Sequence, residues 1–129
     1  MSARTHDATV ALVSHIPQLI AYAYASSPEF VKGKNTNWTE MASTGFDTST
    51  RLASSESDVW LPILTQNKEF VVDGLRLLSQ RIEFIAESIC CNDTKSLKTI
   101  VQNANNVRKV FDKNQIINNE TVESTTQKI

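Results

Sequence analysis

The sequence predicts an all-α protein: a bundle of about five to six helices with a kinked first helix and a long heptad-patterned helix. Apolar residues recur mostly at helical spacing, and no stretch shows the sustained alternation between turn dipeptides that marks β-hairpins. Three glycines in 129 residues leave few positions for tight turns. This length favours one domain, which we place at residues 1–117.

The first helix is predicted to begin near Thr5 or Asp7, since either side chain can cap it, and to end near Ser26. Pro17 lies inside this helix and removes the backbone hydrogen bond to the Val13 carbonyl. We therefore expect a kink at this point.

A loop is predicted over residues 27–35, where Ser, Pro, Gly and Lys replace the apolar pattern. Thr36 or Asn37 can cap a short helix after it. Gly45 is the natural residue to end that helix.

A further helical segment is expected to contain Arg51, and the serine-rich residues 55–57 interrupt the pattern after it. Residues 58–67 then read as a short helix. Pro62 is expected near its first turn, where proline is tolerated.

The strongest periodic signal lies in residues 67–91, which predict one long helix. Its apolar residues follow intervals of 4, 3, 4, 3 and 4, the spacing of a heptad seam: Val71, Leu75, Leu78, Ile82, Ile85 and Ile89. Leu77 and Phe84 add a second apolar face, so we expect this helix to pack on its own domain and on a second copy, giving a homodimer. Packing within a single chain is the alternative.

The last helix follows a turn and cap at residues 92–94. One face of it is apolar: Leu97, Ile100, Val101, Ala104, Val107 and Phe111. Residues 118–129 are polar and are predicted to form a disordered tail, because little in them could offset the entropy cost of ordering.

Charge and composition bear on the classes of partner. The formal net charge is −1 with both signs interspersed, so we expect no nucleic-acid binding. The longest apolar stretch, residues 16–25, falls short of the roughly 18 residues of a membrane span, so we expect no membrane insertion.

Cys90 and Cys91 are adjacent and read as reduced thiols of a cytoplasmic protein. No glycine-rich phosphate loop and no zinc-ligand spacing occurs, so we expect no cofactor or metal site in this chain.

Polar side chains on the apolar first helix are the first candidates for a binding site. Ser14 and Gln18 share a helical face, and His15 can meet Gln18, beside the carbonyl that Pro17 frees. Such a cluster can offer several hydrogen bonds to a polar ligand. The alternative is a buried histidine that serves the fold alone.

Arg51 and Trp60 complete the candidate set. A guanidinium can hold a carboxylate through two parallel hydrogen bonds, and an indole can form a pocket wall. The alternatives are an ordinary surface ion pair for Arg51 and a core position for Trp60. We assign no catalytic residue.

Three blocks of the sequence carry a family resemblance: Ser-His-Ile-Pro-Gln-Leu-Ile-Ala at 14–21, preceded by His-Asp at 6–7; Gly-Phe-Asp-Thr-Ser-Thr-Arg-Leu-Ala at 45–53; and Ser-Asp-Val-Trp at 57–60. They resemble the C-terminal helical domain of prephenate dehydrogenases. That family has Ser-His-Leu-Pro-His-Leu-Leu-Ala, Gly-Phe-Arg-Asp-Thr-Thr-Arg-Ile-Ala and a Ser-Asp-Pro-x-x-Trp region. Asn67 stands where the family has the asparagine that begins its long helix.

The resemblance implies the C-terminal part of an NAD-dependent enzyme that converts prephenate to 4-hydroxyphenylpyruvate by oxidative decarboxylation, on the route to tyrosine. In that family an N-terminal Rossmann domain binds NAD and carries the catalytic histidine. The helical domain forms the dimer and closes the substrate cleft. This chain alone is then expected to be inactive, to bind no NAD, and to contact prephenate or a tyrosine-like molecule.

By resemblance, Arg51 stands at the arginine that binds a substrate carboxylate, while His15 and Trp60 stand at cleft positions. Gln18 replaces the family's second histidine, and Asp47-Thr48 replaces its Arg-Asp pair. These departures leave an arogenate dehydrogenase of the same superfamily as an alternative. A helical interaction domain that acts alone is another.

Overall fold

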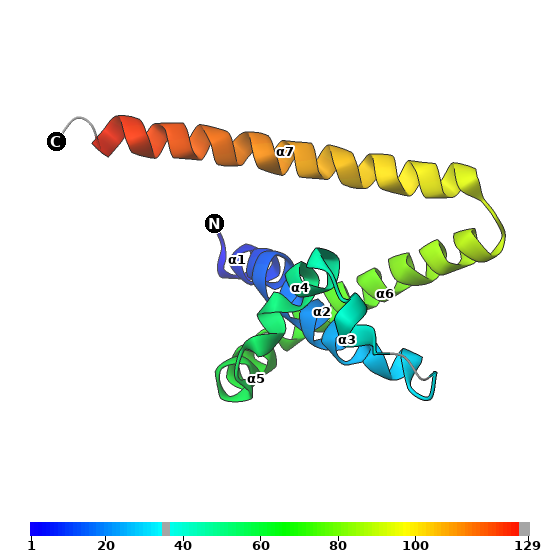
Figure 1. Cartoon of the computed structure of the whole chain (residues 1–129). Coiled ribbons are helices and arrows are strands. Elements are labelled where there is room, and N and C mark those ends of the chain that lie inside the picture. Colours follow the sequence, from blue (N-terminus) through cyan, green and yellow to red (C-terminus); the bar gives the residue numbers. More distant parts are fainter. Residues whose placement is uncertain (35–36, 127–129) are drawn as a thin grey trace. The chain divides into compact units, whose positions relative to one another are not determined.

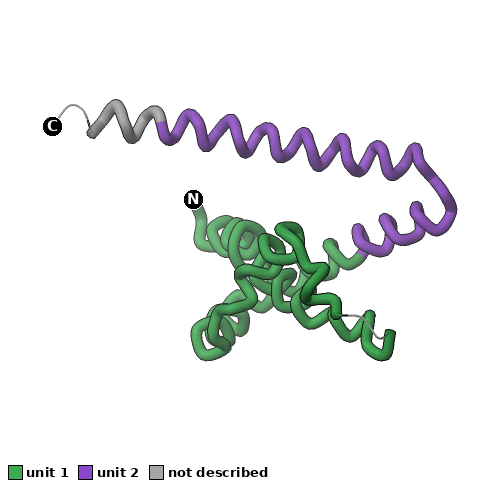
Figure 2. Tube along the Cα trace, viewed as in Figure 1, with its two compact units in different colours: residues 1–79 green, residues 80–129 purple. Residues whose placement is uncertain are grey.

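The computed structural model describes residues 1–34 and 37–126, and for residues 120–126 it describes the backbone alone. This part of the chain contains helices and turns and no β-strand, which confirms the predicted all-α class (Figure 1). The chain divides into two compact units, Met1–Ser79 and Gln80–Ile129 (Figure 2). Each unit is described by itself below.

Unit 1 begins with an unbroken helical run of three parts: α1 (Ala3–Val10), the π-helical turn η1 (Ala11–His15) and α2 (Ile16–Ala25). The Ser2 hydroxyl caps α1 by accepting a hydrogen bond from the Thr5 backbone N–H, 3.1 Å away. The predicted start at Thr5 or Asp7 is therefore wrong, because Ser2, also a residue type that favours the cap position, takes that role earlier in the chain.

The predicted kink takes the form of the π-helical turn. The Ile16 N–H bonds the Ala11 carbonyl five residues back, instead of four as in an α-helix. Pro17 has no N–H to donate, and the widened turn directly before it accommodates that loss. The proline therefore lies directly after the widened turn, as the second residue of α2.

The segments after α2 are short: η2 (Ser27–Val31), α3 (Trp38–Met41), α4 (Thr44–Thr50) and η3 (Arg51–Ser54). Part of the predicted loop is thus the 3-10 helix η2. Asn37 stands at the cap position of α3 as predicted, although its side chain makes no cap hydrogen bond. Thr36 lies outside the described residues.

Gly45 does not end α3, contrary to the prediction. Ala42, in extended conformation, ends that helix, and Gly45 lies in the first turn of α4. Gly45 has an ordinary helical backbone and does not use the conformational freedom of glycine. The positive φ that favours glycine occurs at Gly33 instead, where φ is 80°.

The next helix, α5 (Ser57–Gln66), has Pro62 early in its second turn, just past the first turn near which the sequence predicted it. The helix begins one residue earlier than expected, and Pro62 frees the carbonyl of Asp58. Asp58 is exposed, so water can satisfy that carbonyl.

Helix α2 is the centre of unit 1, and both α4 and η3 pack against it. An aromatic cluster joins α2, α3 and α4: the rings of Tyr24 and Phe46 lie 5.4 Å apart, and those of Trp38 and Phe46 5.2 Å apart. The N-terminal half of α6 (Lys68–Cys90) also belongs to this unit. Its Gly74 faces Ile16 so closely that a Cβ there would overlap the isoleucine Cδ1.

Unit 2 holds the rest of α6 and helix α7 (Thr94–Thr126). The turn between them is a Schellman motif: Asp93 N–H bonds the Ser88 carbonyl, Asn92 N–H bonds the Ile89 carbonyl, and Asn92 has φ of 55°. Asp93 then caps α7 by accepting from the Ser96 N–H at 3.0 Å. The predicted turn and cap at residues 92–94 are confirmed.

The backbone of α7 stays helical past Asn118, the residue at which we predict the polar tail to start. No glycine or proline occurs after Gly74, so no residue type in this segment forces a stop. Residues 127–129 lie outside the described residues. Disorder of residues 118–129 stays a prediction, since an unsupported polar helix is marginal in water.

Much of the apolar surface of unit 2 is exposed. Ile82 and Ile89 of the heptad seam are 57% and 60% exposed. Further exposed apolar side chains follow on both helices: Phe84, Val101, Val107, Val110, Phe111 and Ile116. A monomeric protein rarely exposes so many large apolar residues together.

The run Ala3–Val31 spans 29 residues, and an 18-residue window in it has a mean hydropathy of 1.2 and is 22% buried. Length and composition alone would thus allow a membrane span, which corrects the expectation that no segment is long enough. This is weak evidence for a span, because helices of soluble proteins pass the same test. Gln18 and His15, both polar, are among the buried residues of this run.

Candidate functional site

His15 ends the π-helical turn and is 7% exposed. Its Nδ1 lies 3.3 Å from the side-chain nitrogen of Asn67, the residue directly before α6. The same Asn67 nitrogen donates to the backbone carbonyl of Asp7, 2.8 Å away. Asn67 thus joins α1, the π-helical turn and the start of α6.

Trp60 of α5 packs against the same histidine. The two ring centroids lie 6.1 Å apart with an interplanar angle of 84°, an edge-to-face arrangement. The sequence predicted both residues at the site, and the structure brings them into contact. The bulky indole also helps to bury His15.

Gln18 lies one turn after His15 and is 1% exposed. Its amide nitrogen donates to the backbone carbonyl of Leu52 at 2.6 Å. One turn further along α2, the Tyr22 hydroxyl donates to the carbonyl of Ser55 at 2.8 Å. Because Gln18 and Tyr22 share a face of α2, together they fasten the segment from Leu52 to Ser55 to that helix.

Arg51, the first residue of η3, directly precedes this segment and is exposed. Among the described residues its guanidinium makes no hydrogen bond and no ion pair. The alternative of an ordinary surface ion pair therefore finds no support in the described part of the chain. The five donors of the guanidinium are open to a ligand.

Ser14, the fifth predicted residue, is half-buried, and no hydrogen bond of its side chain occurs among the described residues. The structure thus joins His15 to Trp60 directly, and Gln18 to the Arg51 segment through Leu52. Among the described residues, no hydrogen bond, ion pair or ring contact links the side chain of Arg51 or Ser14 to the other predicted side chains.

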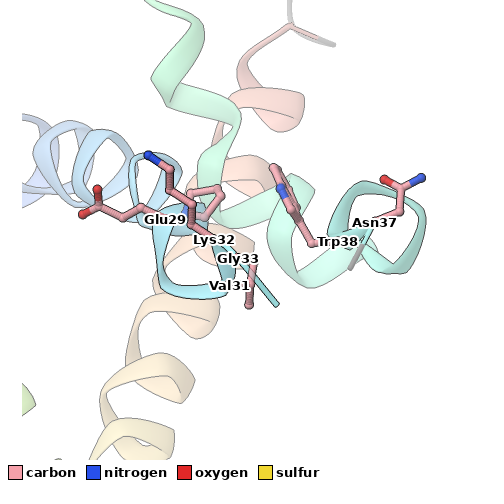
Figure 3. Close-up of a pocket in the computed structure, with 7 residues that line it drawn as sticks. Glu29, Val31, Lys32, Gly33, Asn37 and Trp38 are labelled. Carbon is pink, nitrogen blue, oxygen red and sulfur yellow. The ribbon is translucent and has the colours of Figure 1, made fainter. Parts of the chain in front are cut away.

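A depression of about 950 Å³ lies elsewhere in unit 1, between η2 and α3 (Figure 3). Its lining residues are Pro28, Glu29, Val31, Lys32, Gly33, Asn37 and Trp38. None of the five predicted residues lines it. Its lining residues Gly33 and Asn37 flank, in sequence, a stretch that the structure does not fully describe, so we assign the depression no function.

Two residues of the site had not been predicted from the chemistry of their side chains. Asn67 was matched to a family position alone, and Tyr22 was not singled out. Tyr22 carries a readable signal, since it lies four residues after Gln18 and shares its helical face. The sequence holds no such signal for Asn67, because its contacts with His15 and Asp7 span 52 and 60 residues of sequence.

Comparison with known proteins identifies the family of the chain. Residues 2–103 match the family model described as prephenate dehydrogenase, dimerization domain. The chain belongs to this family. The match covers every predicted site residue, whereas most of α7 lies beyond it.

Two curated relatives are named prephenate dehydrogenase. The protein of Lactococcus lactis subsp. cremoris (strain MG1363) is 21% identical over 112 residues, which cover 87% of this chain and 32% of the relative. That of Bacillus subtilis (strain 168) is 26% identical over 108 residues, covering 84% and 29%. The chain therefore spans about a third of the length of these relatives.

A solved structure, titled as a Synechocystis arogenate dehydrogenase, shares the fold. The TM-score is 0.77 at 20% identity, and the match covers 86% of this chain and 41% of that one. At this level of identity the likeness speaks for the fold alone.

Dehydrogenases of this family are expected to use NAD, and the described residues do not fit such a cofactor. A dinucleotide site needs a strand that leads through a glycine-rich turn into a helix. The described residues contain no strand, and the three glycines of the sequence stand far apart.

Proposed function

We propose that this chain supplies the dimer interface and part of the substrate pocket of an NAD-dependent prephenate dehydrogenase. The reaction is the oxidative decarboxylation of prephenate to 4-hydroxyphenylpyruvate, with NAD as the hydride acceptor. NAD and the catalytic histidine belong to the family's other domain, so this chain alone is inactive. Its own residues bind and orient the substrate.

The observation that carries the proposal is Arg51, whose guanidinium has no partner in the part of the chain that the structure describes, directly before a segment that α2 holds in place. Gln18 and Tyr22 fix the backbone that follows Arg51 through two short hydrogen bonds. An anchored backbone limits where the guanidinium can reach, which lowers the entropy cost of binding a carboxylate. Prephenate carries two carboxylates, and one of them is the proposed ligand of Arg51.

His15, Trp60, Gln18 and Ser14 are proposed to line the same pocket. His15 and Trp60 form a packed, mostly buried pair that can contact the ring of the substrate. Gln18 replaces a family histidine, so its role cannot involve proton transfer. Its amide is held by Leu52, which gives it a part in positioning as well as in binding.

The dimer is proposed to form through the exposed apolar surface of α6 and α7. The heptad seam continues past the buried Val71 to the exposed Ile82 and Ile89. The family's description as a dimerization domain supports a second copy as the partner. A stand-alone interaction domain would use the same surface but would have no affinity for prephenate.

One alternative substrate and three expected properties remain as proposals. The amide of Gln18 in place of an imidazole leaves arogenate as a second candidate substrate. We keep the expectations of a cytoplasmic location, no nucleic-acid partner and no membrane insertion, supported by the mixed charge and the two free cysteines.

A chimera tests the proposal. This chain replaces the matching segment of the Bacillus subtilis relative, and NAD reduction is followed by absorbance with prephenate or with arogenate. We expect activity with prephenate, and a loss of tenfold or more in kcat/KM for the Arg51→Ala chimera. Arogenate-dependent activity alone would favour the alternative substrate.

Two controls make the result decisive. The unmodified Bacillus subtilis protein sets the activity expected in the assay. Circular dichroism and sedimentation show whether the chimera is folded and dimeric. A folded, dimeric chimera that reduces NAD with neither substrate would overturn the proposed function.

A further inference from the structure

The side-chain amide of Asn67 has only one orientation that satisfies its neighbours. One of its two terminal atoms lies 2.8 Å from the Asp7 carbonyl oxygen, which can only accept a hydrogen bond. That atom must therefore be the nitrogen, because an amide oxygen there would face another acceptor. The geometry fixes the NH₂ group without reference to the histidine.

The orientation of Asn67 decides the tautomer of His15. The same NH₂ group lies 3.3 Å from Nδ1 of the imidazole and can only donate to it. Nδ1 must then be the unprotonated nitrogen, and in the neutral ring the proton resides on Nε2. The Nδ1–H tautomer would place two donors against each other.

The Nε2 atom is the open end of this histidine. It has no hydrogen-bond partner among the described residues, although His15 is 7% exposed. In that part of the chain, no buried polar side-chain atom lacks a partner, so Nε2 must reach the surface. Trp60 packs on the ring and restricts its rotation.

We propose that Asn67 is a positioning residue that holds His15 as an Nε2–H donor, so that the site presents His15 to an acceptor oxygen of its ligand. Carboxylate, carbonyl and hydroxyl oxygens qualify as acceptors, whereas an ammonium group does not. The ligand part of this inference rests on the proposed function. The tautomer part does not.

The tautomer is measured on the 129-residue chain labelled with ¹⁵N-histidine. Long-range ¹H–¹⁵N correlation spectra near neutral pH distinguish a protonated from an unprotonated ring nitrogen by chemical shift. We expect unprotonated Nδ1 and protonated Nε2 at His15. A spectrum of the unmodified chain that shows Nδ1–H at this residue overturns the inference.

His6 provides a matched control in the same sample. It is exposed, and its Nδ1 lies 3.1 Å from the Asp7 carboxylate, which can only accept. We therefore expect the opposite tautomer there, with the proton on Nδ1. A His6→Gln variant assigns the two sets of signals.

The Asn67→Asp variant reverses the donor. A carboxylate can only accept, so the proton of His15 is expected to move to Nδ1. A circular dichroism spectrum like that of the unmodified chain shows that the variant is folded. A folded variant that keeps the Nε2–H tautomer overturns the role of Asn67. If the variant does not fold, the spectrum of the unmodified chain still decides the tautomer.

The ligand part is tested in the chimera described above. There, Asn67→Asp is expected to raise KM for prephenate about tenfold, since Nε2 would then face the ligand as an acceptor. An active chimera whose KM does not change overturns the assignment of an acceptor to Nε2. A chimera that carries the unmodified segment and is inactive counts against the proposed function. The spectra of the labelled chain determine the tautomer independently of that result.

Discussion

The side-chain amide of Gln18 donates a hydrogen bond to the backbone carbonyl of Leu52, 2.6 Å away. The donor lies in α2 and the acceptor in η3, so this bond ties the Arg51 segment to the central helix of unit 1. Gln18 is also almost completely buried. A residue predicted as a ligand contact is thus also a part of the fold.

Gln18→Met is expected to destabilise the chain by about 1–3 kcal/mol, because it keeps the side-chain volume and leaves the Leu52 carbonyl without its donor. Tyr22→Phe removes only the hydroxyl that bonds Ser55, and about 0.5–1.5 kcal/mol is expected. Urea unfolding followed by circular dichroism measures both. A Gln18→Met variant as stable as the parent chain would show that the bond contributes nothing.

Arg51→Ala is expected to leave the free energy of unfolding unchanged within about 0.5 kcal/mol, because the side chain is exposed and unpaired in the described part. The chimera should nevertheless lose about 1.5–3 kcal/mol of prephenate binding. Arg51→Lys keeps the charge but not the paired donors, so an intermediate loss is expected. A large loss of stability would instead point to a structural role.

Gly74→Ala is expected to destabilise unit 1 by about 1–3 kcal/mol through overpacking, although alanine favours a helix by about 1 kcal/mol. The added methyl group would overlap Cδ1 of Ile16, which is itself mostly buried. Ile16→Val removes that atom, so the double variant should lose less than the sum of the single variants. Strict additivity in urea titrations would contradict the close approach.

Asp93 gives a pH dependence whose sign follows from its contacts. Hydrogen bonds from the backbone and side chain of Ser96 hold the pKa of the Asp93 carboxyl below its ordinary value. The ionised carboxylate stabilises the folded state because its pKa is lower there than in the unfolded chain, where it is near 4. This stabilisation is fully present above the unfolded pKa and is lost as the pH falls through the folded pKa. Asp93→Ala should fray the start of α7 at neutral pH, with little further change on acidification. Amide hydrogen exchange at residues 94–97 measures this fraying.

The exposed part of the heptad seam should control self-association. Replacing Ile82 and Ile89 together by Glu is expected to weaken the dimer at least about 100-fold, because two apolar side chains would no longer be buried and charges would take their place. Arg81→Glu, on an exposed position beside the seam, is the control. Sedimentation velocity gives the oligomeric state. A dimer that tolerates both glutamates would place the interface elsewhere.

The sequence predicted the long helices better than the short ones, for a physical reason. The periodic apolar pattern of residues 67–91 agrees with α6 to within one residue at each end. The residues that cap the helices were harder to predict, since Ser2, Thr5 and Asp7 are all residue types that favour the cap position. Gly45 was misassigned because glycine can end a helix and can also be part of one.

The candidate site was predictable by residue but not by geometry. Periodicity placed Gln18 near His15, and the structure gives each a partner far along the chain, in Leu52 and Asn67. Such partners depend on how helices pack, and a single sequence holds no direct record of that. The exposure of Arg51, and its lack of a partner among the residues that the structure describes, likewise became visible only in three dimensions.

The π-helical turn at Ala11–His15 inserts, in effect, one extra residue into an otherwise continuous helix. Because each residue of an α-helix rotates the chain by about 100°, the surfaces that α1 and α2 present are offset by that angle. Deleting one residue from this turn would rotate α1 and carry Arg4 away from its ion pair with Glu69. Relatives of different length in this stretch should therefore be aligned with a gap inside the turn, so that the equivalence of His15 is preserved.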